Sequence, residues 1–222
     1  MKYLLAGLML CLCSASALSA QDLIAPVSKL SVKTGLLNLI DPFVPSANIM
    51  AEYRLSPHFT VQGEFGVLLP ASAGRFIEVQ SMRGIRLRPA VRYYTEKSGY
   101  SSFFELLGLR RNAYLTARST FQVQPLQGGS FNQLVTFRGR YRKSGLFLNV
   151  GSRNRLGKNW FVEFASGLGV IYRTEHYLDI PIGAEFVDES FLARSFWAPV
   201  EPLSEVLPSF MFYVNVGYNL IR

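Results

Sequence analysis

The sequence has 222 residues, of which 49% are hydrophobic, 14% aromatic and only 17% charged, with a formal net charge of +8 at pH 7. Disorder needs low hydrophobicity and a high charge fraction, so this composition excludes it. The sequence also holds no heptad run, which excludes a coiled coil. The length fits one domain, and the many Gly, Phe and Tyr residues among few charges predict a β-rich domain with an apolar outer surface.

Residues 1–20 have the layout of a secretory signal peptide, and we expect the domain itself to comprise residues 21–222. A lysine near the start precedes an apolar stretch that is too short to cross a bilayer, and small residues follow it. Cleavage after Ala17 is an alternative. Cys11 and Cys13 both lie in this leader, so we expect neither a disulfide nor a thiolate metal site in the exported domain. After the leader there is no run of about 20 uncharged apolar residues that would predict a transmembrane helix.

Eight segments alternate between apolar and polar residues with a period of two, which predicts β-strands. The clearest is the last, where Phe210 and Phe212 fall on one face and Asn215 and Asn219 on the other. Proline lacks a backbone N–H, so Pro89 requires a local break in the ladder of its strand. The predicted strands cover residues 30–36, 47–55, 59–67, 85–93, 103–114, 146–151, 160–173 and 210–220.

The connections between these strands alternate in length. Three joins are short and rich in turn-forming residues, at 56–58, 95–99 and 154–159. The remaining connections are 40–45, 69–82, 117–140 and 175–207, and three of these four are long. Outer-membrane β-barrels have short periplasmic turns and long extracellular loops, so this asymmetry predicts that architecture.

The two faces of the predicted strands differ in a way that indicates a membrane. The small, charged face suits a filled barrel interior, and the large apolar face suits lipid. We therefore expect an all-β fold, an eight-stranded antiparallel up-and-down transmembrane β-barrel in the cell outer membrane. The alternative is a soluble, lipocalin-like barrel whose apolar face lines a ligand cavity. An aromatic girdle near the short turns supports the membrane interpretation, with members Tyr53, Phe59, Tyr93, Phe104, Trp160 and Tyr218.

The final strand, residues 210–220, together with the segments 149–152 and 163–169, carries a resemblance to known proteins. The sequence resembles the small OmpA/OmpX-type outer-membrane β-barrels, and within them a sparsely characterised family described only as a domain of unknown function. The resemblance implies insertion by the outer-membrane barrel assembly machinery. Arg222 departs from the pattern, because such barrels often end on an aromatic residue.

Charged residues on the predicted inner face are expected to pair with one another, because a buried carboxylate needs a partner. We predict a packed salt-bridge network that plugs the interior. The alternative is that the same charges line a narrow ion path or gate. The network residues are Glu52, Glu64, Arg86, Arg88, Arg92 and Glu163, and Glu105 and Arg111 are also placed inside.

Two predicted surface segments have opposite charge, with residues 117–143 basic and residues 175–207 acidic. Arg138, Arg140 and Arg142 alternate, so they share one face of an extended segment. We expect their guanidinium groups to contact phosphates of lipopolysaccharide. The alternatives are that the two segments pair and close the top of the barrel, or that both are solvated without a specific role. We expect no nucleic-acid partner and a monomer in lipid.

The sequence predicts no catalytic, cofactor or metal site. It has two histidines, of which His58 falls in a short turn and His176 falls at the outer end of a strand beside Glu175. Ser209 is the one loose candidate for a nucleophile near His176. We therefore expect a structural or surface-interaction role in envelope integrity, adhesion or host contact. A lipid-A-modifying enzyme that uses His176 is the alternative.

Overall fold

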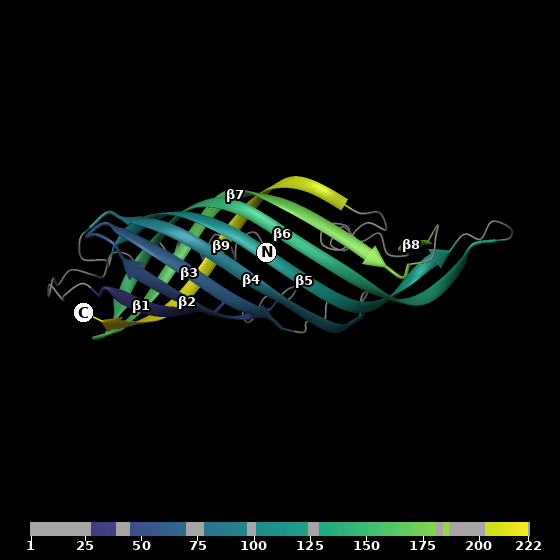
Figure 1. Ribbon diagram of the computed structural model, residues 1–222, viewed down its shortest axis with the longest axis horizontal. Coiled ribbons are helices and arrows are strands. Elements are labelled where there is room, and N and C mark those ends of the chain that lie inside the picture. Colours follow the sequence, from purple (N-terminus) through teal and green to yellow (C-terminus); the bar gives the residue numbers. More distant parts are fainter. Residues whose placement is uncertain are drawn as a thin grey trace, which may run out of the picture.

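The computed structural model describes residues 28–38, 45–69, 78–96, 101–123, 129–180, 184–186 and 203–221. The predicted signal peptide with its two cysteines lies outside these ranges. Within them every regular element is a β-strand (Figure 1), and no helix there is long and apolar enough to cross a membrane. The strands are β1 (Leu30–Gly35), β2 (Ser46–Arg54), β3 (Phe59–Leu68), β4 (Glu78–Tyr94), β5 (Ser102–Val123), β6 (Phe131–Leu156), β7 (Trp160–Leu178), β8 (Ala184–Phe186) and β9 (Leu203–Ile221).

Eight of these strands form one closed antiparallel ring, which is the long body in Figure 1. Each strand pairs with its neighbours in the order β4-β3-β2-β1-β9-β7-β6-β5, and the pairing of β4 with β5 closes the ring. The first strand therefore pairs with the last, Val32 lying opposite Tyr218. The short β8 is attached to the side of β5, opposite Phe121–Val123. The prediction of eight antiparallel strands is confirmed.

Five strands extend well beyond the ranges that the sequence pattern predicts. Strands β5 and β6 have 22 and 26 residues, so much of the segment 117–140, expected to be a loop, is a paired hairpin. A buried apolar cluster on its inner face, completed by Ala184 of β8, stabilises the extension. The hairpin members are Leu115, Ala117, Phe121, Val135 and Phe137. Likewise β4 begins at Glu78, β7 continues to Leu178 and β9 begins at Leu203, so parts of the expected connections 69–82 and 175–207 are strands.

The strand ends that flank the three predicted short joins lie at one end of the ring, although residues 97–99 of the second join are outside the described residues. The N–H of Leu55 and the N–H of Ser56 both donate to the carbonyl of Phe59, which closes the first turn. The third turn contains Gly157 with φ of +80°, a left-handed conformation that glycine adopts without strain. Pro89 also has the expected effect, because β4 and β5 pair up to Leu87 and again from Ala90 but not between them.

Successive residues of each strand point alternately into and out of the ring. In β3, for example, Gln62 and Glu64 are buried inside while Phe65 and Val67 are exposed outside. Aromatic side chains that point inward need small residues opposite. A Cβ added at Gly169 would lie 2.3 Å from the carbonyl oxygen of Leu146 and 2.5 Å from the ring of Phe147. The interior is thus a packed core with both apolar and charged layers.

Candidate functional site

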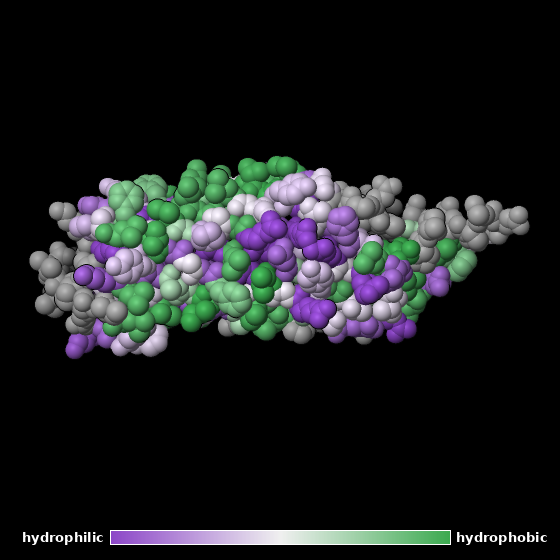
Figure 2. Space-filling view, in the orientation of Figure 1, coloured by the Kyte–Doolittle hydropathy of each residue, from purple (hydrophilic) through white to green (hydrophobic). Residues whose placement is uncertain are grey.

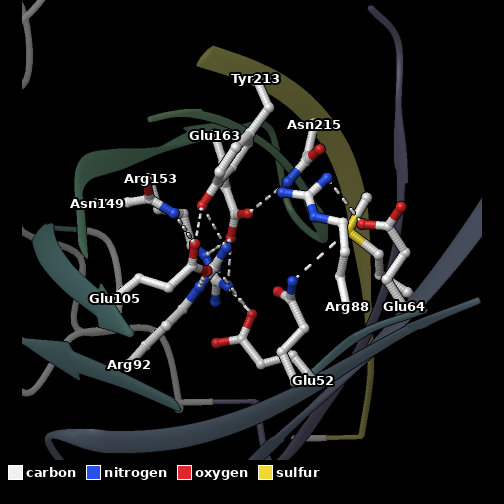
Figure 3. A network of polar contacts seen from close by, with 12 residues as sticks. Glu52, Glu64, Arg88, Arg92, Glu105, Asn149, Arg153, Glu163, Tyr213 and Asn215 are labelled. Atoms are coloured by element: carbon white, nitrogen blue, oxygen red, sulfur yellow. Dashed lines mark hydrogen bonds and ion pairs between the residues drawn. The ribbon is translucent and has the colours of Figure 1, made fainter. Parts of the chain in front are cut away.

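The interior near the short turns holds a group of six charged side chains, which we call the ionic network (Figure 3). All six are buried, with at most 6% of each residue exposed. Three positive and three negative groups leave no formal net charge. They come from six different strands: Lys33 (β1), Glu52 (β2), Arg92 (β4), Glu105 (β5), Arg153 (β6) and Glu163 (β7).

Glu163 lies at the centre of this network, because its carboxylate contacts all three cations. The distance from its oxygens is 3.1 Å to Lys33 Nζ, 3.0 Å to Arg92 Nη1 and 2.7 Å to Arg153 Nε. The amide of Asn215 on β9 also donates to it, at 3.3 Å. Glu163 is completely buried, so these groups replace the water that would otherwise solvate its charge.

The other two carboxylates are bound by cations and by neutral donors. Arg92 Nε donates to Glu105 at 2.5 Å, and Lys33 Nζ lies 2.5 Å from Glu52. Tyrosine hydroxyls donate further hydrogen bonds to these two carboxylates. Tyr94 donates to Glu52 at 2.9 Å, and Tyr213, whose hydroxyl points into the centre in Figure 3, donates to Glu105 at 2.8 Å.

Neutral side chains extend the network to the remaining strands of the ring. Gln62 of β3 accepts a hydrogen bond from Lys33 Nζ, and Tyr213 of β9 accepts one from Arg92 Nη2 at 2.9 Å. Aromatic rings pack against the guanidinium groups, since Arg92 lies 4.3 Å from the centre of the Phe103 ring and Arg153 lies 4.3 Å from that of Phe161. All eight strands of the ring are therefore linked through its interior.

A second group of charges lies beside the ionic network, further from the short turns. Glu64 of β3 contacts Arg86 at 2.6 Å and Arg88 at 3.0 Å. The guanidinium of Arg88 lies over the ring of Tyr213 at 5.2 Å, next to the ionic network. Figure 3 shows Glu64 and Arg88 together on one side of the interior, with Arg92 and Glu105 on the other.

The six residues expected to form one inner network are thus all buried and ion-paired, but in two groups. Glu52, Arg92 and Glu163 meet in the ionic network, and Glu64, Arg86 and Arg88 form the second group. The expected set omits three members of the ionic network. Lys33 and Glu105 lie on the polar face of predicted strands, whereas Arg153 lies beyond the predicted end of its strand. The signal that could have identified Arg153 is its spacing of four from the inward-facing Asn149.

Arg138, Arg140 and Arg142 lie on the outer face of β6 and are all exposed. They do not share the same contacts. Arg138 donates to Asp179 at 2.6 Å, just after the end of β7, and this hydrogen bond holds the pKa of the Asp179 carboxyl below its ordinary value. Arg140 lies over the ring of Tyr114 on β5, 5.4 Å from its centre. With the pairing of β8 to β5, the Arg138–Asp179 contact links the basic and acidic segments.

In the part of the chain that the structure describes, neither histidine contacts a carboxylate or a serine hydroxyl. His176 is exposed on the outer face, opposite Arg140, whereas Glu175 points inward and contacts Arg173 and Tyr177. Ser209 pairs with Gly169, seven residues from His176 along β7, which is roughly 23 Å at 3.3 Å per residue. His58 lies in a short turn, with Nδ1 2.8 Å from the carbonyl oxygen of Tyr94. Among the described residues, no group of His, Cys, Asp and Glu is arranged to hold a metal ion.

Comparison with known proteins identifies a family but no characterised relative. No curated protein and no solved structure matches the sequence. The model of a family described as "Protein of unknown function (DUF3575)" matches residues 6–200. This agrees with the expected membership of a sparsely characterised family, while the likeness to OmpA/OmpX-type proteins stays a prediction. Because the match covers most of the chain, the protein belongs to the DUF3575 family of proteins of unknown function.

Proposed function

We propose that the protein is an integral outer-membrane β-barrel with a plugged polar interior, and that it has a structural or surface-interaction role at the cell envelope. The observation that carries this proposal is an inversion of polarity along the outer face of the ring. Near the short turns, outward positions are apolar and exposed. Leu148 of β6 and Leu168 of β7 each have 71% of their surface exposed.

Further along β6, the outward positions from Arg142 to Thr136 are polar. On β6 the outward side chains change from Leu148 and Leu146 to Arg142, Arg140 and Arg138. An exposed apolar surface is costly in water and favourable in lipid, whereas charged groups require water or a polar headgroup. Strand β6 has an apolar outer face near the short turns and a charged outer face further along. This order fits a strand that crosses the apolar layer of a membrane and continues beyond it.

The apolar belt has a height suited to a bilayer. On β7 the outward residues from Trp160 to Tyr172 are apolar or aromatic except for Ser166, and on β4 the outward residues from Tyr93 to Ile85 are all apolar or aromatic. These stretches have 13 and 9 residues. Tilted by about 40° at about 3.3 Å per residue, they span roughly 33 and 23 Å, close to the apolar band of about 25 Å in outer-membrane barrels. A closed ring also leaves no strand edge unpaired in lipid. We place the short turns in the periplasm and the long hairpins outside the cell.

The charged interior favours a plug over a ligand cavity. A soluble carrier of the lipocalin type would use an apolar interior to bind its ligand. Here Lys33 and Arg92 are buried inside the ring, and both contact the buried carboxylate of Glu163. We therefore assign the ionic network the role of a closed, electrically neutral core that fixes the strands around it.

The experiment that tests this function is cell fractionation combined with gel mobility of unboiled and boiled protein. A detergent-resistant barrel migrates differently until heat unfolds it. We expect the protein in the outer-membrane fraction, as a monomer with a heat-dependent shift, after insertion by the barrel assembly machinery. A soluble periplasmic protein without a shift would contradict the proposal.

A further inference from the structure

Beyond the interior charges, the outer face of the long strands carries a compact group of cationic and aromatic side chains, which we call the outer arginine surface. By the alternation of each strand, its members all point out of the ring. In Figure 2, hydrophilic residues gather near the middle of the visible face, over β5 and β6. The surface comprises Arg83 of β4, Arg110, Asn112 and Tyr114 of β5, and Arg140 and Arg142 of β6.

Strand register brings these residues together. Arg83 pairs with Tyr114, and Tyr114 pairs with Arg140, so the three lie in one row across neighbouring strands. Asn112 and Arg142 form part of the next row. Adjacent strands are about 4.8 Å apart, so the backbone positions of Arg83 and Arg140 are roughly 10 Å apart. Both arginines are therefore within reach of one ligand over Tyr114.

The surface also contains a depression. It has a volume of about 380 Å³ and is lined by Arg83, Gly84, Ile85, Asn112 and Tyr114. The guanidinium of Arg140 lies over the ring of Tyr114, 5.4 Å from its centre, at the border of this depression. A polar group that enters it would meet arginine donors on both sides.

The cations of this surface have no acidic partner among the described residues. The ion pairs of the described chain include Arg138 with Asp179, but none for Arg83, Arg140 or Arg142. Arg110 donates to the hydroxyl of Ser144, a neutral group. Like charges held this close repel one another, so the surface favours a ligand that brings negative charge.

Its position restricts the kind of anion. Immediately toward the short turns, the outward residues of β5 and β6 are apolar, including Leu106, Leu146 and Leu148. A ligand that covers both regions needs negative groups over the arginines and hydrocarbon chains over the apolar residues nearer the short turns. Arginine binds phosphate through two parallel hydrogen bonds, which favours phosphate as the negative group.

We propose that the outer arginine surface binds the phosphates of the lipid A part of lipopolysaccharide in the outer leaflet. This inference rests on the proposed insertion in the outer membrane. It differs from a general contact through Arg138, Arg140 and Arg142, because Arg138 is bound by Asp179 while Arg83 and Arg110 join the site. The acyl chains of the lipid pack on the apolar belt below.

The test uses protein purified from outer membranes in detergent, and follows the temperature at which the heat-dependent gel shift occurs as lipopolysaccharide is added. Binding to the folded state raises this temperature. The variant R83Q/R140Q removes the two cations beside Tyr114. The matched control, R155Q/K158Q, removes two exposed positive charges at the opposite end of the ring, one near the end of β6 and one in the turn that follows. Dephosphorylated lipopolysaccharide and phosphatidylglycerol serve as comparison ligands.

We expect lipopolysaccharide to raise the transition temperature of the wild type and of the control alike. R83Q/R140Q should require an about tenfold higher lipopolysaccharide concentration for the same rise in temperature, since charge-assisted contacts are lost. Dephosphorylated lipopolysaccharide should have little effect. Equal responses of R83Q/R140Q and the control would overturn the site. An equal effect of the dephosphorylated ligand would overturn phosphate recognition, and an equal effect of phosphatidylglycerol would overturn the assignment to lipid A. In each case, location and heat-dependent mobility of the wild type test the membrane proposal separately.

Discussion

Replacing Glu163 with glutamine tests the ionic network at its centre. Glu163 is completely buried and contacts Lys33, Arg92 and Arg153 within 3.2 Å. Glutamine preserves the shape but removes the charge, so three buried cations then face two carboxylates. Removing one partner of a buried pair costs about 3–5 kcal/mol, because the remaining charge is left uncompensated. We expect E163Q to lower the free energy of unfolding by about this amount.

A second substitution separates charge balance from packing. K33M alone should also destabilise the protein, but E163Q/K33M removes one charge of each sign and restores neutrality. The double variant should therefore lose less stability than the sum of the two single variants, by roughly 0.5–3 kcal/mol. E96Q, at an exposed turn position, is the control and should change stability by less than about 0.5 kcal/mol.

The assay is urea unfolding of the protein in lipid vesicles, followed by tryptophan fluorescence. A free energy for E163Q within about 0.5 kcal/mol of the wild type would refute the reasoning. Strict additivity in E163Q/K33M would refute it as well, because the charges would then act independently.

Four further outcomes follow from the same structure. L148R, in the apolar belt, should destabilise the vesicle-inserted protein by about 2–4 kcal/mol, while T136R, on the outer face of the extended hairpin, should leave the urea midpoint unchanged; similar effects of the two would contradict the belt. G169A should lose about 1–3 kcal/mol in the same assay, because its Cβ would lie 2.3 Å from a backbone oxygen, and wild-type stability would argue against close packing there. Since Arg138 lowers the pKa of Asp179, the ion pair should persist above that pKa and be lost as the pH falls through it; carboxyl NMR should show a higher Asp179 midpoint in R138Q, and an unchanged midpoint would disprove the contact. In planar bilayers the wild type should show no conductance above leak, and steady single-channel currents would contradict a plugged interior.

Within the predicted strands, alternation is sufficient to predict which residues face inward, but not at what height they lie. Glu64 and Arg92 each lie an even number of residues from other inward-facing positions of their strands, so alternation assigns both to the inner face. Height depends on the register of strand pairs, and register places Glu64 opposite Arg88 and Arg92 opposite Glu105. Alternation alone does not specify that pairing, so it predicts one network where the structure has two groups.

The long hairpin was not predictable by the same rule. In the apolar belt, large hydrophobic residues face outward. In the extension they face inward, at Leu115 and Phe137, while Thr116 and Arg138 face outward. A search for strands with polar inner and apolar outer faces therefore ends where the polarity of the two faces is exchanged. Arg153 was missed for a related reason, because the residues around it resemble a turn although β6 continues to Leu156.

We propose that lipid surrounds the part of the ring near the short turns, and that water surrounds the extended hairpin of β5 and β6. This arrangement is tested most directly by spin labels at L148C and T136C, two exposed outward positions of β6, in protein inserted in vesicles. Collisions with oxygen, which is enriched in lipid, and with a water-soluble nickel complex report the surroundings of each label. We expect oxygen to dominate at residue 148 and the nickel complex at residue 136. Dominance of the nickel complex at both positions would contradict the account, because the apolar belt would then face water.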